Sequence, residues 1–412
     1  MTELRPPSDK SITHRAMILA AMSRSRVTIR NALICEDTLR TLGAITALGA
    51  ETAIRGGDVI VEGRPWKAPG LIDCGNSGTT ARLLLGAVAG HHLQVTFDGD
   101  DSLRRRPMLA LVSLLRRMGA DVKGEKLPIT VRGGDLKGLN TLLPVPSAQV
   151  KSGVLLAGLA SGVGVSLLEP VATRDHTERL LRYLPGVTIR SARMENAQAV
   201  ILDAGVWPPK FFPSVHVPAD PSAAAFLAAA ALVQGREIRL TDVCLNPTRT
   251  GFFDALLRMG AKIHTVRARE IGGELVGDLI VLKSPPLQAV EVDFEEVPRM
   301  IDEIPVLAAL AMTAHGTSWF YGLGELRKKE SDRVDAILQN LRGLGVKAQE
   351  KLDVLTVPGK GRAPSSGRID TRGDHRILMA FAAVSPWLSF SETRSNAISY
   401  PDYWRDLEAI RG

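Results

Sequence analysis

Two kinds of predicted helix alternate six times along this chain of 412 residues. The first kind is amphipathic and ends at or near a glycine, at residues 38–50, 109–120, 177–186, 251–261, 334–346 and 403–412. The second kind is apolar on almost every face, at residues 11–22, 78–89, 152–159, 222–233, 304–314 and 377–384. A helix without a polar face has to be buried. We therefore predict an α/β fold of two domains, each with three buried helices inside three layers of sheet and surface helix.

The charge and composition of the chain limit the kinds of molecule that it is expected to bind. It has 51 Lys and Arg against 44 Asp and Glu, a net charge of +7, but aromatic residues make up only 5%. Because the basic residues form no long runs, this favours small polyanions over nucleic acid. Three scattered cysteines are too few for a zinc site and favour a reducing, cytoplasmic location. No secretory signal is expected, and the longest apolar run, residues 223–233, is too short to span a membrane.

Polar residues precede each of the buried helices. A helix N-terminus offers unpaired N–H groups and a partial positive charge, which suit phosphate and carboxylate groups. Ordinary N-capping explains any single copy about equally well. Capping does not explain Lys10, Lys151 and Arg376, because the helix dipole disfavours a cation at that end. Several such helix starts together favour an anion site in a cleft between the domains, whose junction falls near residues 217–220.

Two pairs of basic residues are candidate ligands for anions. Lys10 and Arg15 combine a point charge with a planar fork about one helical turn apart, a good pair for phosphate plus carboxylate. Lys329 and Arg333 are four residues apart and would share a helical face if a helix has already begun at Lys329, although a surface helix with salt bridges explains them equally well.

Other segments carry weaker signals. The glycine-bearing turn at residues 73–82 is similar to phosphate-cradling loops but lacks the lysine of a nucleotide-binding P-loop. Residues 246–251 indicate a turn and a helix cap, which is a structural role. Arg104 and Arg105 indicate a solvated charge cluster.

Nine short segments, taken in order, carry a family resemblance. They lie at residues 7–11, 71–82, 102–108, 147–159, 173–178, 246–251, 301–303, 330–333 and 374–376, and include Asp-Lys-Ser at 9–11, Asn-Ser-Gly-Thr at 76–79 and Asp-His-Arg at 374–376. Together they closely resemble the 5-enolpyruvylshikimate-3-phosphate synthase family over nearly the whole chain. The resemblance implies the enolpyruvyl transferase fold, an inside-out α/β barrel with three βαβαββ units in each of two domains. We expect an N-terminal domain at residues 10–218, a C-terminal domain at 1–9 plus 219–412, and the active site in the cleft between them.

The resemblance implies a transferase of the shikimate pathway, which leads to chorismate and the aromatic amino acids. The family moves the enolpyruvyl group of phosphoenolpyruvate to the 5-hydroxyl of shikimate 3-phosphate, through a tetrahedral intermediate, and releases phosphate. It implies no metal, no organic cofactor and a monomer. The two substrates carry about five to six negative charges, and an uncompensated buried charge costs several kcal/mol. Six cations are available to match them: Lys10, Arg15, Arg106, Lys329, Arg333 and Arg376.

The resemblance also assigns roles to individual residues. The shikimate 3-phosphate ligands would be Lys10, Ser11, Arg15, Ser147, Gln149, Thr173, Asp302 and Lys329. The phosphoenolpyruvate ligands would be Lys10, Gly78, Arg106, Gln149, Arg333 and Arg376. Asp302 would accept the proton of the 5-hydroxyl, and Glu330, helped by Lys329, would handle the proton at the methylene carbon. Lys10 would touch both substrates at the hinge, and His375 is a further local contributor.

The sequence departs from the family pattern at several positions. Ser8 stands where a glycine commonly precedes Asp-Lys-Ser, so its φ should be negative or the turn strained. Thr173 replaces a common serine but keeps the hydroxyl, whereas Ala148 removes a hydroxyl that some members have. Ile398 stands where some members place a lysine that binds phosphoenolpyruvate. Since only nine residues precede Lys10, we expect the family's first strand to be trimmed.

Two expectations concern ligands. The domains should close around shikimate 3-phosphate, because the clustered cations repel one another until an anion lies between them. Glyphosate should compete with phosphoenolpyruvate, because Gly78 leaves room where the methyl group of an alanine would intrude.

Three alternatives are weaker. A UDP-N-acetylglucosamine enolpyruvyl transferase shares the fold, but that family carries a cysteine in the loop corresponding to residues 100–106, where this chain has none. A nucleic-acid-binding protein of related fold would show basic stripes interleaved with aromatic residues. A catalytically inactive relative would not need to keep Asp302, Glu330, Lys329 and Lys10 together.

Overall fold

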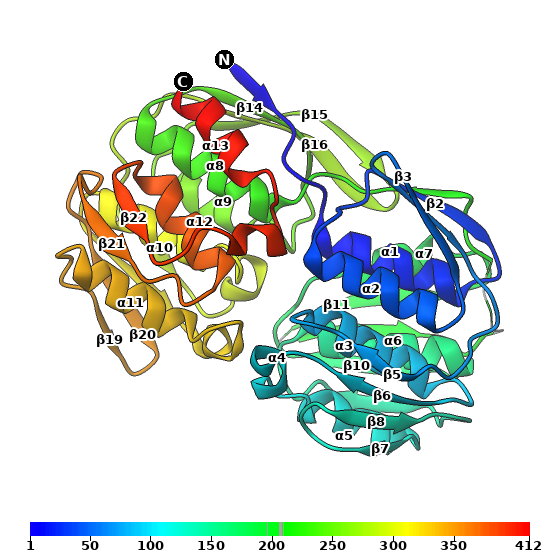
Figure 1. Ribbon diagram of the computed structural model, residues 1–412. Coiled ribbons are helices and arrows are strands. Elements are labelled where there is room, and N and C mark those ends of the chain that lie inside the picture. The colour runs from blue at the N-terminus through cyan, green and yellow to red at the C-terminus, as the bar shows by residue number, and fades with distance from the viewer. Residues whose placement is uncertain (196, 206–207, 209) are drawn as a thin grey trace. The chain divides into compact units, whose positions relative to one another are not determined.

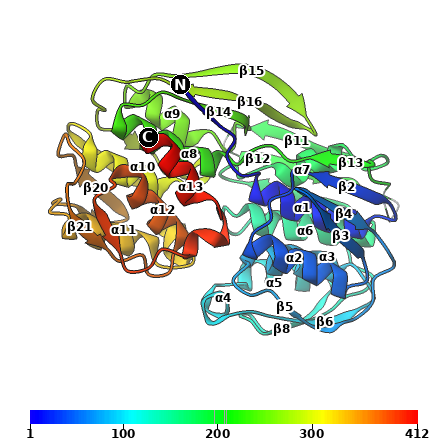
Figure 2. The same ribbon diagram turned by 45° about the horizontal axis from the view of Figure 1, so that its top comes forward.

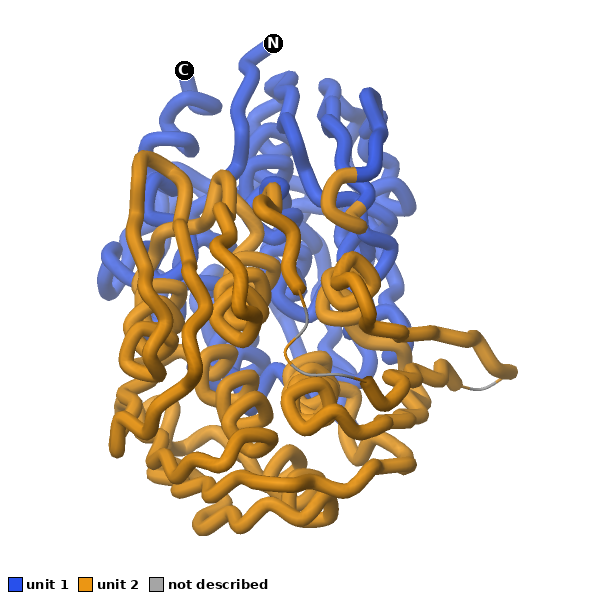
Figure 3. Tube along the Cα trace, turned by 90° about the vertical axis from the view of Figure 1, so that its right-hand side faces the viewer, with its two compact units in different colours: residues 1–7, 218–270, 275–412 blue, residues 8–217, 271–274 orange. Residues whose placement is uncertain are grey.

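The computed structural model describes residues 1–195, 197–205, 208 and 210–412 of the chain. These residues form two compact units, coloured separately in Figure 3. Unit 1 comprises Met1–Pro7, Pro218–Glu270 and Leu275–Gly412, and unit 2 comprises Ser8–Val217 and Ile271–Glu274. The chain therefore begins in unit 1, builds unit 2 and returns to unit 1, and the short tip at residues 271–274 belongs with unit 2.

Three buried helices form the centre of unit 2. They are α1 (Lys10–Met22), α3 (Gly78–Ala89) and α6 (Ala148–Ser161), and they lie where the sequence predicts buried helices, α6 beginning four residues early. The backbones of α3 and α6 pack so closely that a Cβ on Gly86 would lie 1.9 Å from the carbonyl oxygen of Gly153. The amphipathic helices are α2 (Glu36–Ala47), α5 (Leu109–Met118) and α7 (His176–Arg182), with the short α4 (Asp101–Arg105) before α5.

Three four-stranded sheets lie outside these helices, as Figure 2 shows. In spatial order the first is β13 (Ser214–His216), β2 (Arg26–Arg30), β4 (Asp58–Glu62) and β3 (Glu51–Arg55). The second is β5 (Gly70–Asp73), β6 (Gln94–Asp98), β8 (Ile129–Arg132) and β7 (Asp121–Lys123). The third is β11 (Ile189–Met194), β12 (Ala197–Leu202), β10 (Val165–Glu169) and β9 (Leu139–Leu142). Alternate residues such as Val27 and Ile29 are fully buried, so each sheet turns one face to the helices.

Unit 1 repeats this design. Its buried helices are α8 (Pro221–Gln234), α10 (Ile304–Thr313) and α12 (His375–Val384), and its amphipathic helices are α9 (Gly251–Arg258), α11 (Arg333–Gly343) and α13 (Tyr403–Arg411). The side chains of α8, α10 and α12 dominate one continuous apolar core. Three short 3₁₀ turns are η1 (Val297–Arg299), η2 (Gly324–Lys328) and η3 (Ser395–Ile398).

The sheets of unit 1 are less regular than those of unit 2. The first is β1 (Thr2–Leu4), β14 (Ile238–Cys244), β16 (Glu274–Val281) and β15 (Ile263–Ile271). The second is β17 (Glu291–Val292), β18 (Thr317–Tyr321), β20 (Val354–Pro358) and β19 (Gln349–Lys351). The third has two described strands, β21 (Gly367–Ile369) and β22 (Leu388–Phe390).

Each four-stranded sheet has the same pairing, which is the βαβαββ unit. In spatial order, the first strand runs parallel to the second, and the third runs antiparallel to both the second and the fourth, as in β5-β6-β8-β7 (Figure 1). The sixth unit differs, because in the described residues it stops after α13 with two strands. The first strand of the chain is short but present, since β1 pairs with β14 through Thr2 and Ile238. None of the helices described is both long enough and apolar enough to cross a membrane.

Candidate functional site

The starts of the buried helices are mostly N-capped. The side chains of Asp9, Ser77, Ser147, Asp220 and Asp374 each accept a hydrogen bond from a backbone N–H of the following helix, whereas Glu303 before α10 makes no such bond. Capping therefore occurs at five of the six buried helices described. Each cap satisfies a backbone N–H but leaves others in the first turn, so capping and anion binding can coexist at one helix.

In unit 2, Lys10 opens α1 and already has an anionic partner. Its Nζ lies 2.7 Å from Oδ2 of Asp37 on α2, and the Lys10 side chain is 14% exposed. Asp37 could not be identified as this partner from the sequence, because the two residues are 27 positions apart. Ser8, two residues earlier, has a negative φ, as its departure from glycine predicts.

Arg15 is buried where α1, α6 and α7 meet. Its Nε donates to the Thr177 hydroxyl at 2.8 Å, its Nη2 to the Ser152 hydroxyl at 2.9 Å, and its Nη1 to the Ser11 carbonyl at 3.1 Å. These acceptors fix the direction of the guanidinium without adding a negative charge of their own. Arg15 is therefore held in one orientation, as a site for an anion requires.

Gly78, Arg106 and Gln149 are brought together through Arg82. Gln149 Oε1 accepts from Nη1 of Arg82 at 2.8 Å, and its Nε2 donates to the Thr79 hydroxyl at 2.9 Å. A Cβ on Gly78 would lie 2.7 Å from Nη1 of Arg82 and 3.4 Å from Nη1 of Arg106. Arg82 was missed as a site residue, although it stands in the turn at residues 73–82 that the sequence singles out.

Arg106 is positioned by the loop before α3. Its Nη1 and Nη2 donate to the backbone carbonyl of Asn76 at 3.1 Å and to Oδ1 of Asn76 at 2.5 Å. The neighbouring Arg104 is instead exposed and pairs with Asp98 at 2.7 Å, which confirms the interpretation of that residue as solvated charge.

Thr173 borders a buried ion cluster that includes Lys151 of α6, the helix that Ser147 caps. The Thr173 hydroxyl donates to Oε1 of Glu169 at 2.6 Å. Lys151 pairs with both Glu169 and Glu178, at 2.8 and 2.7 Å, and all three side chains are fully buried. Lys151, which the sequence places among the cations that favour an anion site, is instead enclosed with two carboxylates and has no exposed side-chain surface.

In unit 1, Arg333 is surrounded by three carboxylates. It donates to Asp374 at 2.9 Å, to Asp302 at 3.2 Å and to Glu330, and it is 1% exposed. Burial alone would lower the pKa of Arg333, but the three carboxylates outweigh it and raise that pKa, so the guanidinium stays charged. Lys329 Nζ lies 4.0 Å from Asp302.

Two expectations for this segment are wrong. Helix α11 begins at Arg333 with Asp332 as its N-cap, so Lys329 precedes the helix and does not share a helical face with Arg333. The surface salt-bridge helix is also excluded, because the Arg333 side chain is buried.

Arg376 and its neighbours complete the unit 1 cluster. Arg376 follows the first residue of α12, is 5% exposed, and lies over the Phe226 ring with its Cζ 5.8 Å from the centroid. Asp374 caps α12 and also accepts from Arg333 and Ser331, a role that the sequence did not indicate.

Residues 246–251 form the predicted turn, in which Asn246 accepts from the Thr248 N–H, but Thr250 makes no side-chain cap bond at the start of α9. Arg249 is 1% exposed and donates to Asp220 at 2.9 Å and to the Ser222 hydroxyl at 3.0 Å, which ties this turn to the start of α8.

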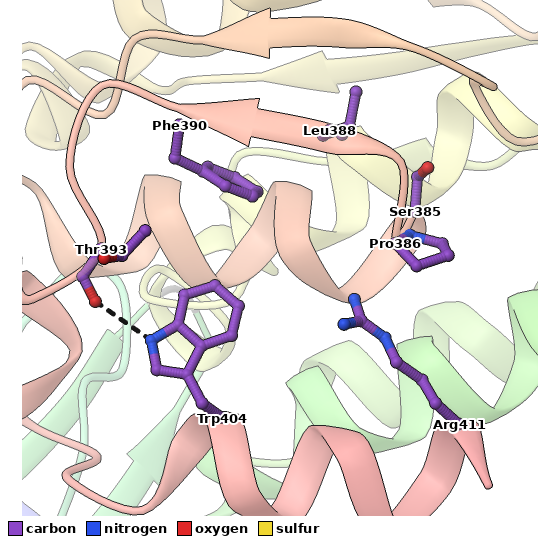
Figure 4. Close-up of a pocket in the computed structure, with 7 residues that line it drawn as sticks. All are labelled: Ser385, Pro386, Leu388, Phe390, Thr393, Trp404 and Arg411. Carbon is purple, nitrogen blue, oxygen red and sulfur yellow. Dashed lines mark hydrogen bonds between the residues drawn. The ribbon is translucent and has the colours of Figure 1, made fainter.

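Two further features concern metal ligands and cavities. In the described part of the chain, no group of three or more His, Cys, Asp or Glu residues is placed to hold a metal ion. The cavity of about 360 Å³ shown in Figure 4 lies in unit 1, between β22 and α13, and none of the predicted site residues lines it. Its lining residues are Ser385, Pro386, Leu388, Phe390, Thr393, Trp404 and Arg411.

The repeated βαβαββ units place the chain in the enolpyruvyl transferase fold. The enolpyruvyl transferase NikO from Streptomyces tendae superimposes with a TM-score of 0.77 at 18% identity, covering 100% of this chain and 95% of that one. EPSP synthase from Acinetobacter baumannii superimposes with a TM-score of 0.84 at 34% identity, covering 99% of this chain and 95% of that one.

Sequence comparison identifies the family. The model of the family described as EPSP synthase (3-phosphoshikimate 1-carboxyvinyltransferase) matches residues 1–407. The 3-phosphoshikimate 1-carboxyvinyltransferases of Thermus thermophilus and Aquifex aeolicus are 45% and 43% identical, each covering 98% of this chain and 95% and 96% of their own lengths. The chain belongs to the EPSP synthase family, and it is a transferase.

Proposed function

We propose that this chain transfers the enolpyruvyl group of phosphoenolpyruvate to the 5-hydroxyl of shikimate 3-phosphate and releases phosphate. The observation that carries the proposal is the family match over residues 1–407. Within it, Lys10, Arg15 and Arg106 of unit 2 and Arg333 and Arg376 of unit 1 are held in fixed positions by their neighbours, as two highly anionic substrates require.

The unit 2 cluster supplies the groups that bind shikimate 3-phosphate. Arg15, Lys10 and Ser11 cluster at the start of α1, and Ser147 and Gln149 at the start of α6, so both helices offer N–H groups beside their side chains. Thr173 adds a hydroxyl from the segment before α7. Asp302 and Lys329 of unit 1 are assigned to the same substrate.

Phosphoenolpyruvate is assigned to Lys10, Gly78, Arg106 and Gln149 of unit 2 and to Arg333 and Arg376 of unit 1. The absence of a side chain at Gly78 leaves the guanidinium groups of Arg82 and Arg106 room to approach a small anion. Ile398 supplies no charge here, so phosphoenolpyruvate has one cation fewer than in relatives with a lysine at this position.

Asp302, Glu330 and Lys329 perform the proton transfers. Asp302 takes the proton of the 5-hydroxyl while the oxygen of that hydroxyl bonds to C2 of phosphoenolpyruvate. At the same time Glu330, helped by Lys329, delivers a proton to C3. In the resulting tetrahedral intermediate, loss of a proton from C3 re-forms the double bond and expels phosphate from C2. Arg333 bonds both Asp302 and Glu330 and so positions the base and the acid with one guanidinium.

We further propose that both clusters serve one pair of substrates and that shikimate 3-phosphate draws the two units together. The enzyme would work as a cytoplasmic monomer on small anions, without a nucleic acid or membrane partner. Small-angle scattering should show a smaller radius of gyration after shikimate 3-phosphate is added, and an unchanged radius at saturation would contradict closure.

Phosphate release tests the proposed reaction. Purified protein should release phosphate only when phosphoenolpyruvate and shikimate 3-phosphate are both present. Replacing shikimate 3-phosphate with UDP-N-acetylglucosamine should abolish the release, and release with the sugar nucleotide would support the alternative transferase. If calorimetry shows binding of shikimate 3-phosphate but no phosphate is released, the binding of phosphoenolpyruvate is defective. Ile398→Lys is then the first variant to test.

A further inference from the structure

A buried ion cluster lies directly beside Thr173 and takes no part in the proposed chemistry. Glu169, at the end of β10, accepts the Thr173 hydroxyl at 2.6 Å through Oε1 and pairs with Lys151 of α6 at 2.8 Å through Oε2. Lys151 also pairs with Glu178 of α7 at 2.7 Å and donates to the Thr173 carbonyl at 3.4 Å. The side chains of Lys151, Glu169 and Glu178 are 0% exposed.

The cluster has one ammonium group for two carboxylates. Strand β10 lies between β9 and β12, and neither of these two neighbours carries an ionisable side chain in its described residues. Lys151 faces Glu169 from α6, and Glu178 faces it from α7. Nearby, Arg15 donates to Thr177, Arg179 pairs with Asp175, and His176 lies 2.7 Å from Glu274. Burial raises the pKa of Glu169 even though Lys151 and Thr173 oppose that shift.

The Thr173 hydroxyl cannot serve Glu169 and a phosphate at the same time. A hydroxyl has one proton to donate, and a phosphate dianion offers only acceptor oxygens. If Thr173 donates to the phosphate of shikimate 3-phosphate, Oε1 of Glu169 loses its donor in a place with no access to water. An ionised carboxylate left in that state is strongly disfavoured.

We propose that Glu169 takes up a proton when Thr173 turns to shikimate 3-phosphate, so that Glu169 is a positioning residue that couples substrate affinity to pH. The inference rests on the proposed function, because it requires Thr173 to bind this phosphate. The exchange is balanced: the Thr173 O–H bond stays intact and changes acceptor from Glu169 to a phosphate oxygen, and one proton from the solvent converts the Glu169 carboxylate to a carboxylic acid. The cluster then holds one ammonium and one carboxylate.

Titration calorimetry with shikimate 3-phosphate alone tests the inference. At pH 8 the phosphate group of the ligand is already doubly ionised, because its second pKa is about 6, so proton uptake by the ligand itself is small. Measured in two buffers of different ionisation enthalpy, the wild-type protein should take up about one proton more per ligand bound than Glu169→Gln. Its dissociation constant should rise by up to about tenfold per pH unit, whereas that of Glu169→Gln should change much less.

Two variants at Thr173 separate positioning from a general structural effect. Thr173→Ser keeps the hydroxyl and should keep the proton uptake, whereas Thr173→Val should bind more weakly and lose it. Wild-type protein that binds the ligand without taking up a proton, or Thr173→Val that takes up as much as wild type, would overturn the inference and leave the proposed function intact. Absence of any binding of shikimate 3-phosphate would remove both.

Discussion

The two site clusters of the molecule hold their arginines in different ways. In unit 2, Arg15 donates to two hydroxyls and a backbone carbonyl, and Arg106 donates to the amide and carbonyl oxygens of Asn76. In unit 1, Arg333 donates to three carboxylates and is fully enclosed by them. Hydroxyl and carbonyl acceptors orient a guanidinium without contributing a charge, whereas carboxylates also neutralise it.

We propose that this difference in how the arginines are held reflects a larger share of substrate binding in unit 2 and the proton transfers in unit 1. A cation oriented by neutral acceptors can match the charge of an incoming anion, which suits the substrate-binding role of unit 2. A cation that bonds Asp302 and Glu330 sets the positions of two groups that exchange protons with the substrate, which suits unit 1.

The largest effect is expected from Arg333→Met. The variant leaves Asp374, which is 0% exposed, without its cation, and breaking a buried pair costs about 3–5 kcal/mol. Urea denaturation should show a loss of this size. The matched control is Arg327→Met, because Arg327 pairs with Asp332 and Glu350 but is 32% exposed, so less than about 1 kcal/mol should be lost. Equal losses in the two variants would contradict the buried-network description.

Arg15→Gln should weaken the binding of shikimate 3-phosphate. Loss of charge-assisted hydrogen bonds worth about 1.5–3 kcal/mol raises the dissociation constant roughly ten- to hundredfold. Calorimetry measures this directly, with the exposed Arg104→Gln as a control that should bind within about twofold of wild type, since exposed ion pairs contribute little. Unchanged affinity in Arg15→Gln would remove Arg15 from the binding site.

Gly78→Ala should act on phosphoenolpyruvate and its competitor glyphosate. The new methyl group would lie 2.7 Å from Nη1 of Arg82, so that guanidinium has to move. Overpacking of about 1–3 kcal/mol would raise the inhibition constant of glyphosate by about five- to 150-fold, with a smaller rise in the KM of phosphoenolpyruvate. Steady-state inhibition kinetics measure both values, and inhibition equal to that of wild type would show that Gly78 does not border the anion.

The smallest expected effect is a loss of folding stability at acidic pH. His14 of α1 is fully buried, with Nδ1 2.7 Å from the Thr41 hydroxyl, and burial, followed by Lys10 and Arg15, holds its pKa well below 6.5. The unfolded chain binds a proton at His14 below about pH 6.5 and the folded chain does not, so stability falls as pH drops from 6.5 towards 5. The slope should approach about 1.4 kcal/mol per pH unit.

Urea denaturation between pH 7.5 and 5 measures this slope, and His14→Gln should flatten it. In unit 1, hydrogen bonds from Arg372 and Gln339 lower the pKa of Asp335, and that contribution is lost only as pH falls below about 4. A slope that is the same with and without His14 would contradict the assignment.

Local patterns predicted most of the helices but few of their long-range partners. The apolar helices and their polar starts are visible in sequence because helix period and capping act within a few residues. The partners Asp37 of Lys10, Arg82 of Gln149 and Asp374 of Arg333 are 27, 67 and 41 positions away, so only the fold brings them together.

The same reason explains the errors in the prediction. Lys151 has the sequence features of an anion ligand, and its neutralisation by Glu169 and Glu178 depends on where β10 and α7 lie. Two sheets take their first strand from a distant segment, β13 for β2 and β1 for β14, which a repeat pattern does not reveal. The roles of Asp302 and Glu330 came from family resemblance, because carboxylates near an arginine are common on helix surfaces.

The most direct test of the separation between binding and proton transfer is Asp302→Asn, examined for both functions in one preparation. Calorimetry should show a dissociation constant for shikimate 3-phosphate within about tenfold of wild type, since the amide keeps an acceptor oxygen for the 5-hydroxyl and loss of a negative charge does not disfavour an anionic ligand. Phosphate release should fall by at least about a hundredfold, the usual contribution of a general base. Phosphate release near the wild-type rate, or a loss of binding as large as the loss of turnover, would contradict the account.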